Sequence, residues 1–305
     1  MRSKTGFNAC LRRAGTASLL LLSLLAWQRG SQPAWAQATT PPAQGAACDR
    51  GAFRVIVDVG HTAEAPGARS ARGALEYDFN LRLATLIEHK LVAAGFEKTV
   101  LLVTGGAKRK SLFDRAARAN RSSADLFLSI HHDSVPTRFF QSWEYEGKHF
   151  NFSDRFPGHS IFVSYDNADF AGSLEFGRLL GLALKAHGLR YTPHYTERFM
   201  GHRQRQLLDA DAGVYRYDQL IVLKNTRMPA VLLEAGSIIN RDEELQLGSP
   251  ERQALIVAGV ADAVESFCAS RHPRAPHQAA RRPAAATAAK TALRPAAATA
   301  SPVKR

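Results

Sequence analysis

Short apolar runs rich in β-branched residues alternate with segments of helical period along most of this 305-residue chain. The first run, residues 53–59, ends at Gly60 and is typical of a buried strand. From Glu76, apolar residues recur at helical spacing as far as Gly95. This alternation predicts a single α/β domain with a mainly parallel central sheet covered by helices on both faces. Further strands are expected at 99–103, 126–130, 161–164, 220–223 and 231–234, and further helices from Ser111, from about Ala171 and from Ser249-Pro250.

The two ends of the chain do not follow this pattern. Residues 1–36 combine basic residues, an apolar run and a small-residue cleavage site, which is typical of an export signal. A membrane anchor is the alternative, but the run is short for a bilayer and the cleavage site follows it. We therefore expect a signal peptide over 1–36, a short linker over 37–47, a folded domain over 48–270 and a disordered, basic Ala/Pro-rich tail over 271–305.

The net charge of +13 by itself suggests nucleic-acid binding. The distribution of this charge along the chain changes that interpretation. Residues 1–36 carry five Lys or Arg and residues 271–305 carry eight, with no acidic residue in either. These account for the whole excess, so the segment between them is neutral overall. We therefore expect no specific nucleic-acid partner. The tail either attracts polyanions or is simply solvated, and the sequence leaves both open.

The cysteines bear on the compartment. Cys10 belongs to the signal segment, so Cys48 and Cys268 remain, one before the first strand and one in the last helix. In an oxidising compartment they would form a disulfide, and two reduced buried thiols are the alternative. The signal segment predicts an exported protein without a transmembrane anchor. The lack of any evident wall-anchoring repeat favours the periplasm, although release into the medium stays open.

Four residues with useful chemistry lie at or next to strand ends. His61 follows the first strand, Glu76 opens the first long helix, His131 follows residues 126–130, and Glu234 ends the run 231–234. In parallel sheets, ligands bind beyond the carboxyl ends of the strands. We therefore expect these four side chains to converge.

Two imidazoles and one carboxylate form a catalytic zinc site that leaves one position open for water. A second carboxylate is then needed to take up a proton and return it as the amide nitrogen leaves, and Glu234 is the candidate. A carboxylate ending an apolar strand is otherwise difficult to explain. Each residue alone is more often structural, so these residue types leave a metal hydrolase and a non-catalytic domain equally open.

The local sequences around these residues are more specific. They are Ile56-Val57-Asp58-Val59-Gly60-His61, residues 75–81, residues 124–131, residues 222–236 and Ile239-Asn240, within an ordered match over most of 53–267. Here the chain resembles the zinc-dependent N-acetylmuramoyl-L-alanine amidases of the type 3 family. The resemblance implies one Zn²⁺ per chain held by His61, Glu76 and His131, with Glu234 as the catalytic glutamate. It also implies that the domain over 48–270 hydrolyses the amide between N-acetylmuramoyl residues and L-alanine in peptidoglycan.

The chain departs from the family pattern at two places. Val59-Gly60-His61 stands where the family often has Pro-Gly-His, and His132-Asp133 stands where it has a small residue and Asn. Neighbouring residues on a strand point to opposite faces, so His132 is not expected to share a metal with His131. Asp133 either orients a ligand imidazole or is an ordinary residue at the start of a loop.

Two segments are longer than the family pattern requires. Residues 134–158 are rich in aromatic side chains, and residues 190–212 are basic and polar. Long irregular segments in a compact domain are usually functional or disordered. Some relatives carry an inhibitory helix that a partner removes, so we hypothesise that one segment lines or blocks the cleft and that a protein activator relieves the block. A loop that only covers the core is the alternative.

Two other functions compete with the amidase prediction. A zinc peptidase of carboxypeptidase-like chemistry uses the same kinds of ligand and base. A non-catalytic peptidoglycan-binding or regulatory protein needs neither. The presence of Glu234 together with three candidate ligands argues against the latter.

Overall fold

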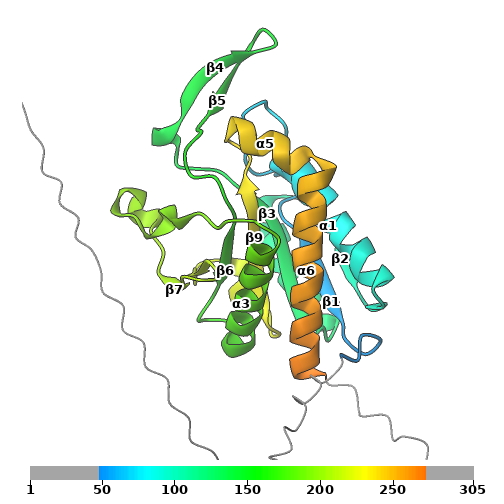
Figure 1. Ribbon diagram of the computed structural model, residues 1–305. Coiled ribbons are helices and arrows are strands. Elements are labelled where there is room, and N and C mark those ends of the chain that lie inside the picture. Colours follow the sequence, from blue (N-terminus) through cyan, green and yellow to red (C-terminus); the bar gives the residue numbers. More distant parts are fainter. Residues whose placement is uncertain (1–47, 273–305) are drawn as a thin grey trace, which may run out of the picture. The chain divides into compact units, whose positions relative to one another are not determined.

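A seven-stranded sheet lies at the centre of the structure, a computed structural model that describes residues 48–272 (Figure 1). In spatial order the strands are β2 (Val100–Leu102), β1 (Val55–Val59), β3 (Leu126–Asp133), β9 (Ala230–Ser237), β6 (Ser160–Val163), β8 (Val214–Arg216) and β7 (Leu207–Asp209). The neighbours β2, β1, β3 and β9 run parallel to one another, and β6 and β8 are parallel to each other but antiparallel to β9. The edge strand β7 is antiparallel to β8. The predicted mainly parallel sheet is confirmed.

Helices cover both faces of this sheet, as the sequence predicted. Alternate residues of each strand enter different cores: Val57 and Leu128 pack in one, Ile56 and Phe127 in the other. Because both faces are covered, the central strands are apolar throughout rather than alternating with polar residues. The first core also contains α1 (Glu76–Ala93), α3 (Phe170–Ala186) and α6 (Pro250–Arg271); the second contains residues of α2 (Lys108–Arg121) and α4 (Ile221–Asn225).

Helix α6 is long and apolar enough to cross a membrane by length and composition alone. In the structure it is a core helix, with Val260, Val264 and Phe267 buried against the sheet and its neighbouring helices. Ser249 caps its first turn by accepting a hydrogen bond from the backbone N–H of Arg252. Near its other end, Cys268 forms a disulfide with Cys48, the first of the two states that the sequence left open.

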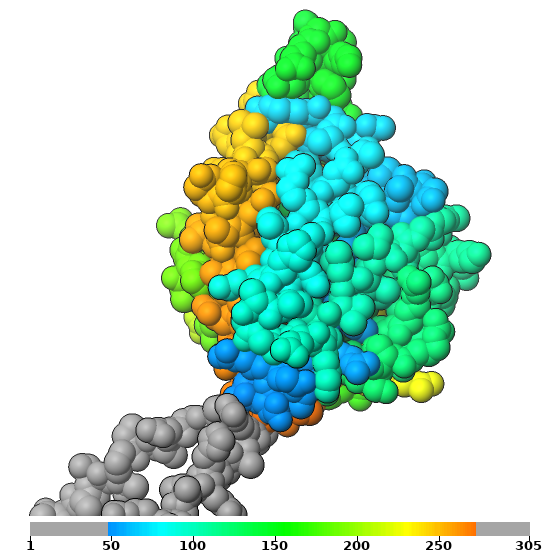
Figure 2. Space-filling view, turned by 90° about the vertical axis from the view of Figure 1, so that its right-hand side faces the viewer, coloured from blue at the N-terminus to red at the C-terminus, as the bar shows by residue number. Residues whose placement is uncertain are grey.

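Three local expectations were wrong or incomplete. Residues 220–223 are not a strand, because α4 begins at Ile221, and a short apolar run cannot be assigned from periodicity alone. Ser111 does not cap α2, which begins at Lys108; its hydroxyl donates to the Lys108 carbonyl from inside the helix. Residues 134–158 are not wholly irregular, since they contain an antiparallel hairpin of β4 (Gln141–Tyr145) and β5 (Lys148–Phe152) that projects from the body of the molecule (Figures 1 and 2).

The remaining elements are short. Helix α5 (Arg241–Gly248) precedes α6, and three 3₁₀ segments span Thr137–Phe139, Pro193–Thr196 and Arg198–Arg203. The predicted signal peptide, the linker over 37–47 and the tail beyond residue 272 lie outside the described residues and stay predictions.

Candidate active site

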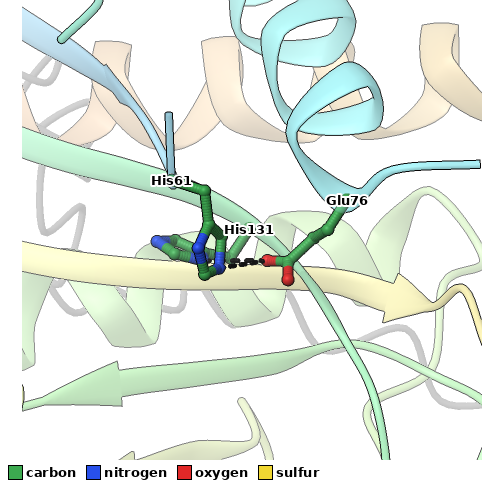
Figure 3. Close-up of side chains that lie close together, drawn as sticks. All are labelled: His61, Glu76 and His131. Atoms are coloured by element: carbon green, nitrogen blue, oxygen red, sulfur yellow. Dashed lines mark hydrogen bonds and ion pairs between the residues drawn. The ribbon is translucent and has the colours of Figure 1, made fainter. Parts of the chain in front are cut away.

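His61, Glu76 and His131 converge at the carboxyl edge of β1 and β3, as the sequence predicted. Glu76 Oε1 lies 3.0 Å from His61 Nε2 and 3.1 Å from His131 Nδ1. Figure 3 shows both imidazoles and the carboxylate pointing toward one another. One donor atom from each residue lies within 4.8 Å of the other two. The three side chains can therefore act on a common centre.

The backbone around this cluster is shaped to hold it. His61 adopts a left-handed conformation with φ of 69°, which is uncommon outside glycine. A Cβ on Gly60 would lie 2.5 Å from His131 Nε2, and a Cβ on Gly67 would collide with the Glu76 carboxylate and the His61 ring. Both positions therefore need glycine, because the side chains of the cluster occupy the space that a Cβ atom would take.

A buried arginine fixes the backbone of His61. Arg115 is 1% exposed, and its Nη2 donates to the His61 carbonyl oxygen at 2.5 Å. Its Nε donates to Thr104 Oγ1 at 3.1 Å and lies 3.7 Å from Asp58 Oδ1. Burial raises the pKa of Asp58 to about 6, against the opposing effects of Arg115 and a hydrogen bond from Ser129. This pair was not predicted from the sequence, although an aspartate within an otherwise apolar strand is a signal of it.

The charge states of the cluster suit a divalent cation. Burial acts to raise the pKa of Glu76, but hydrogen bonds from His131 and His61 outweigh it and the net pKa is lowered. The backbone N–H of Ala68 also donates to Glu76 Oε2 at 2.9 Å. Burial lowers the pKa of His131 to about 4, an effect that Glu76 only partly offsets. The carboxylate is thus ionised and the His131 imidazole neutral, as metal ligands must be.

Glu234 lies beside the cluster but outside it. It is paired with His131 across β3 and β9, within the strand rather than at its end, because both strands extend further than the sequence suggested. Its Oε2 is buried and has no hydrogen-bond partner in the described part of the chain. Burial raises the pKa of Glu234 well above its usual value, and the carboxylates of Asp133 and Glu76 raise it further.

His132 and Asp133 are both buried and neither joins the cluster. His132 Nδ1 lies 2.7 Å from Asn80 Oδ1, and burial lowers the pKa of His132 to about 3. This agrees with the expectation from strand alternation. Asp133 is the last residue of β3 rather than a loop residue, and its Oδ2 accepts a hydrogen bond from the Tyr195 hydroxyl at 2.6 Å. Among residues 48–272, no hydrogen bond joins Asp133 to a ligand imidazole.

A cavity of about 450 Å³ contains the cluster and Glu234. Arg203, from the basic segment 190–212, lines it, whereas residues 138–156 do not. The hairpin instead lines an adjoining cavity of about 300 Å³ through Phe150 and its neighbours, and the two cavities share Ala68 and Ser134. The larger cavity of about 560 Å³ near His159 contains none of the four candidate residues.

Comparisons with known proteins give one consistent result. The model of a family described as N-acetylmuramoyl-L-alanine amidase matches residues 55–266, which include all four candidate residues. The endolysin of Bacillus phage SPP1 is 28% identical over 190 residues, which are 62% of this chain and 56% of the endolysin, so the chain spans little more than half of that relative.

Two solved structures share the fold. The N-acetylmuramoyl-L-alanine amidase from Clostridium difficile 630 has a TM-score of 0.53 and 23% identity, over 72% of this chain and 99% of that one. The amidase Ami1 from Mycobacterium smegmatis has a TM-score of 0.55 and 18% identity, over 72% of this chain and 98% of that one.

Proposed function

The chain belongs to the N-acetylmuramoyl-L-alanine amidase family, and we propose that it hydrolyses the amide between N-acetylmuramoyl residues and L-alanine in peptidoglycan, using one zinc ion held by His61, Glu76 and His131. The convergence of two imidazoles and a carboxylate from three separate elements, with Glu234 beside them, carries this proposal. The family match confirms the membership that the sequence predicted, whereas the zinc ion and the substrate belong to the proposal. The roles of the individual residues remain proposals.

The residues present fit a zinc ion. Two nitrogen donors and one oxygen donor lie within 4.8 Å of one another at the wall of a cavity, which is the ligand set of a catalytic rather than a closed structural site. The glycines at positions 60 and 67 leave room for the donors. Ala68 N–H and Asn80 hold the Glu76 carboxylate, which is how outer groups commonly orient metal ligands.

Zinc, when bound, polarises a carbonyl oxygen and makes water a stronger nucleophile near neutral pH. Burial raises the pKa of Glu234, and a cation held by the neighbouring cluster would oppose this effect and favour the ionised carboxylate. In that form Glu234 would accept the proton of the attacking water and return it to the amide nitrogen as the bond to L-alanine breaks. The absence of any hydrogen-bond partner for its Oε2 within residues 48–272 supports this role. Arg115 would keep His61 in place through the His61 carbonyl.

The product of sacculus digestion tests the amidase against a zinc peptidase. An amidase releases intact stem peptides with a free L-alanine amine, whereas a peptidase cuts within the stem peptide. Purified protein with bound zinc should release the former. Release of shortened peptides alone would support the peptidase, and no release with zinc bound would support a non-catalytic protein.

We further propose that the protein is exported and acts in the periplasm. The Cys48–Cys268 disulfide supports an oxidising compartment, and the signal predicted over residues 1–36 supports export. A protein activator and a gating role for residues 134–158 or 190–212 stay predictions. Replacing residues 141–152 by a short turn tests the hairpin: unchanged hydrolysis by a folded variant would exclude gating by it.

A further inference from the structure

We propose that the Arg203 guanidinium binds a carboxylate of the stem peptide, so that the enzyme prefers substrates in which the residue after L-alanine carries a free acid. This inference rests on the proposed function and concerns which substrate is selected.

Arg203 is held in the cavity that contains the candidate catalytic residues. It ends the 3₁₀ segment Arg198–Arg203 and lines the same 450 Å³ cavity as His131 and Glu234. Its Nη1 donates to the Ser134 carbonyl oxygen at 3.2 Å. Ser134 directly follows β3 and is three residues after His131, a proposed zinc ligand. The bond to Ser134 therefore holds the guanidinium near the proposed zinc site.

The charge of Arg203 is not matched by an ion pair within residues 48–272. Arg72, Arg216 and Arg241 each pair with a carboxylate there, with Glu244, Asp218 and Asp154 respectively. The nearby Asp133 is engaged instead by the Tyr195 hydroxyl and the Ser134 N–H. A guanidinium has five N–H donors, and the single bond to Ser134 leaves others available in the cavity.

The guanidinium group favours a carboxylate as the ligand. Its planar fork pairs with a carboxylate through two parallel hydrogen bonds, which are stronger than bonds between neutral groups. An uncharged amide in the same place offers one acceptor and no charge. Lys108, the other Lys or Arg lining this cavity among the described residues, is an exposed point charge on a flexible chain and gives no such geometry.

A structural role is the competing explanation. Arg203 acts to lower the pKa of both Asp133 and Glu234, so it could serve only to balance these buried acids. That role would affect every substrate equally, whereas carboxylate binding affects only substrates that carry the acid.

The experiment compares two synthetic muropeptides, N-acetylmuramoyl-L-alanyl-γ-D-glutamyl-L-lysinamide and its D-isoglutaminyl analogue, with wild-type enzyme, Arg203→Gln and Arg198→Gln. The γ-carboxyl and the C-terminus are amidated in both, so only the first carries a free carboxylate on the residue after L-alanine. Arg198 is exposed in the same segment and does not line the cavity, so its variant matches the charge change. We expect Arg203→Gln to reduce kcat/KM about 10-fold to 100-fold on the acid, mainly through KM, with less than about 3-fold loss on the amide. Arg198→Gln should change neither substrate, and Arg203→Lys should recover part of the loss.

Equal losses on both substrates, or none on the acid, would overturn the inference. If Arg203→Gln does not fold, the wild type alone still decides, because equal kcat/KM for acid and amide is incompatible with carboxylate selection. Failure of the zinc-loaded wild type to cleave either substrate would instead refute the proposed function.

Discussion

His131 and Glu234 are partners in register across the parallel strands β3 and β9. The proposed metal ligand and the proposed base are therefore held by the hydrogen-bonding ladder of the sheet rather than by a loop. Strand positions in a packed core are more rigid than loop positions, which suits a reaction that needs two groups at a fixed separation.

Glu234→Gln should retain zinc and lose turnover. The amide keeps the size of the side chain but cannot accept a proton, so hydrolysis of sacculi should fall by about 10²-fold to 10⁴-fold. Zinc content and released L-alanine amines are measured on the same preparation. Glu144→Gln, on the exposed hairpin, is the matched control. A Glu234→Gln variant of near wild-type activity would remove Glu234 from the mechanism.

Removing the metal should abolish activity reversibly. Dialysis against a chelator should stop hydrolysis, and zinc should restore it, because the proposed reaction needs the cation that the three donors would hold. His61→Ala or His131→Ala should lower the zinc content below one per chain, whereas His89→Ala, which removes an exposed histidine, should not. A chelated preparation that still digests sacculi would contradict the zinc proposal.

Arg115→Leu should destabilise the domain by about 3–5 kcal/mol, because it leaves Asp58 buried without its cation. It should also weaken zinc binding, since the His61 carbonyl loses its donor. Urea unfolding and zinc titration measure the two effects. Adding Asp58→Asn should recover part of the stability but not the zinc affinity. Arg118→Leu, at an exposed position on the same helix, is the control, and an equal loss there would contradict the prediction.

Loss of the Cys48–Cys268 disulfide should lower the stability of the domain without changing the candidate active site. Cys48 and Cys268 are 220 residues apart, so the bond restricts a very long loop in the unfolded chain. Cys48→Ser with Cys268→Ser should cost about 2–5 kcal/mol of unfolding free energy. Activity at a temperature where the variant remains folded should be unchanged. A variant as stable as the oxidised wild type would show that the bond does not contribute.

The buried His159 predicts a stability change in acid. Burial, with Arg252 nearby, lowers its pKa to about 4 from an ordinary value of 6.5. Between these values the unfolded chain binds a proton at this histidine that the folded chain does not, so the contribution of His159 to the free energy of unfolding should fall as the pH drops from about 6.5 to 4. The full contribution is about 3 kcal/mol. Asp58 acts in the opposite direction, since its pKa is raised to about 6.

Comparison with His159→Gln isolates this histidine. Unfolding free energies of both proteins are measured from pH 4 to pH 8, and their difference should shrink toward acid as the wild type loses its advantage. A difference that is constant with pH would show that His159 titrates normally.

The candidate site could be predicted from sequence because His61 and Glu76 lie next to a strand end and at a helix start, and because His131 and Glu234 directly follow or end the apolar runs of β3 and β9, although both lie within those strands. His61 and His131 follow or lie in adjacent parallel strands, so local patterns were sufficient to bring them together. The position of Arg203 was not predictable in this way. It reaches the cleft through a contact with Ser134, 69 residues away in the chain, and no local periodicity encodes that distance.

The errors in the fold have a similar origin. Val222 and Leu223 are buried in a short helix, and four apolar residues fit a strand equally well until their packing is known. The hairpin was missed because its aromatic residues suggested an irregular insertion. Its pairing of Trp143 with Phe150 depends on a two-residue turn at Glu146 and Gly147, both with positive φ.

The disulfide also fixes where the chain enters and leaves the domain. Cys48 is bonded to the last helix, and Asp49 N–H donates to the His272 carbonyl, so both ends meet at one place, before β1 begins. The proposed zinc site lies at the other end of β1, where His61 follows the strand. An attachment made at Cys48 or at His272 would therefore leave the candidate active site free at the opposite end of the strand.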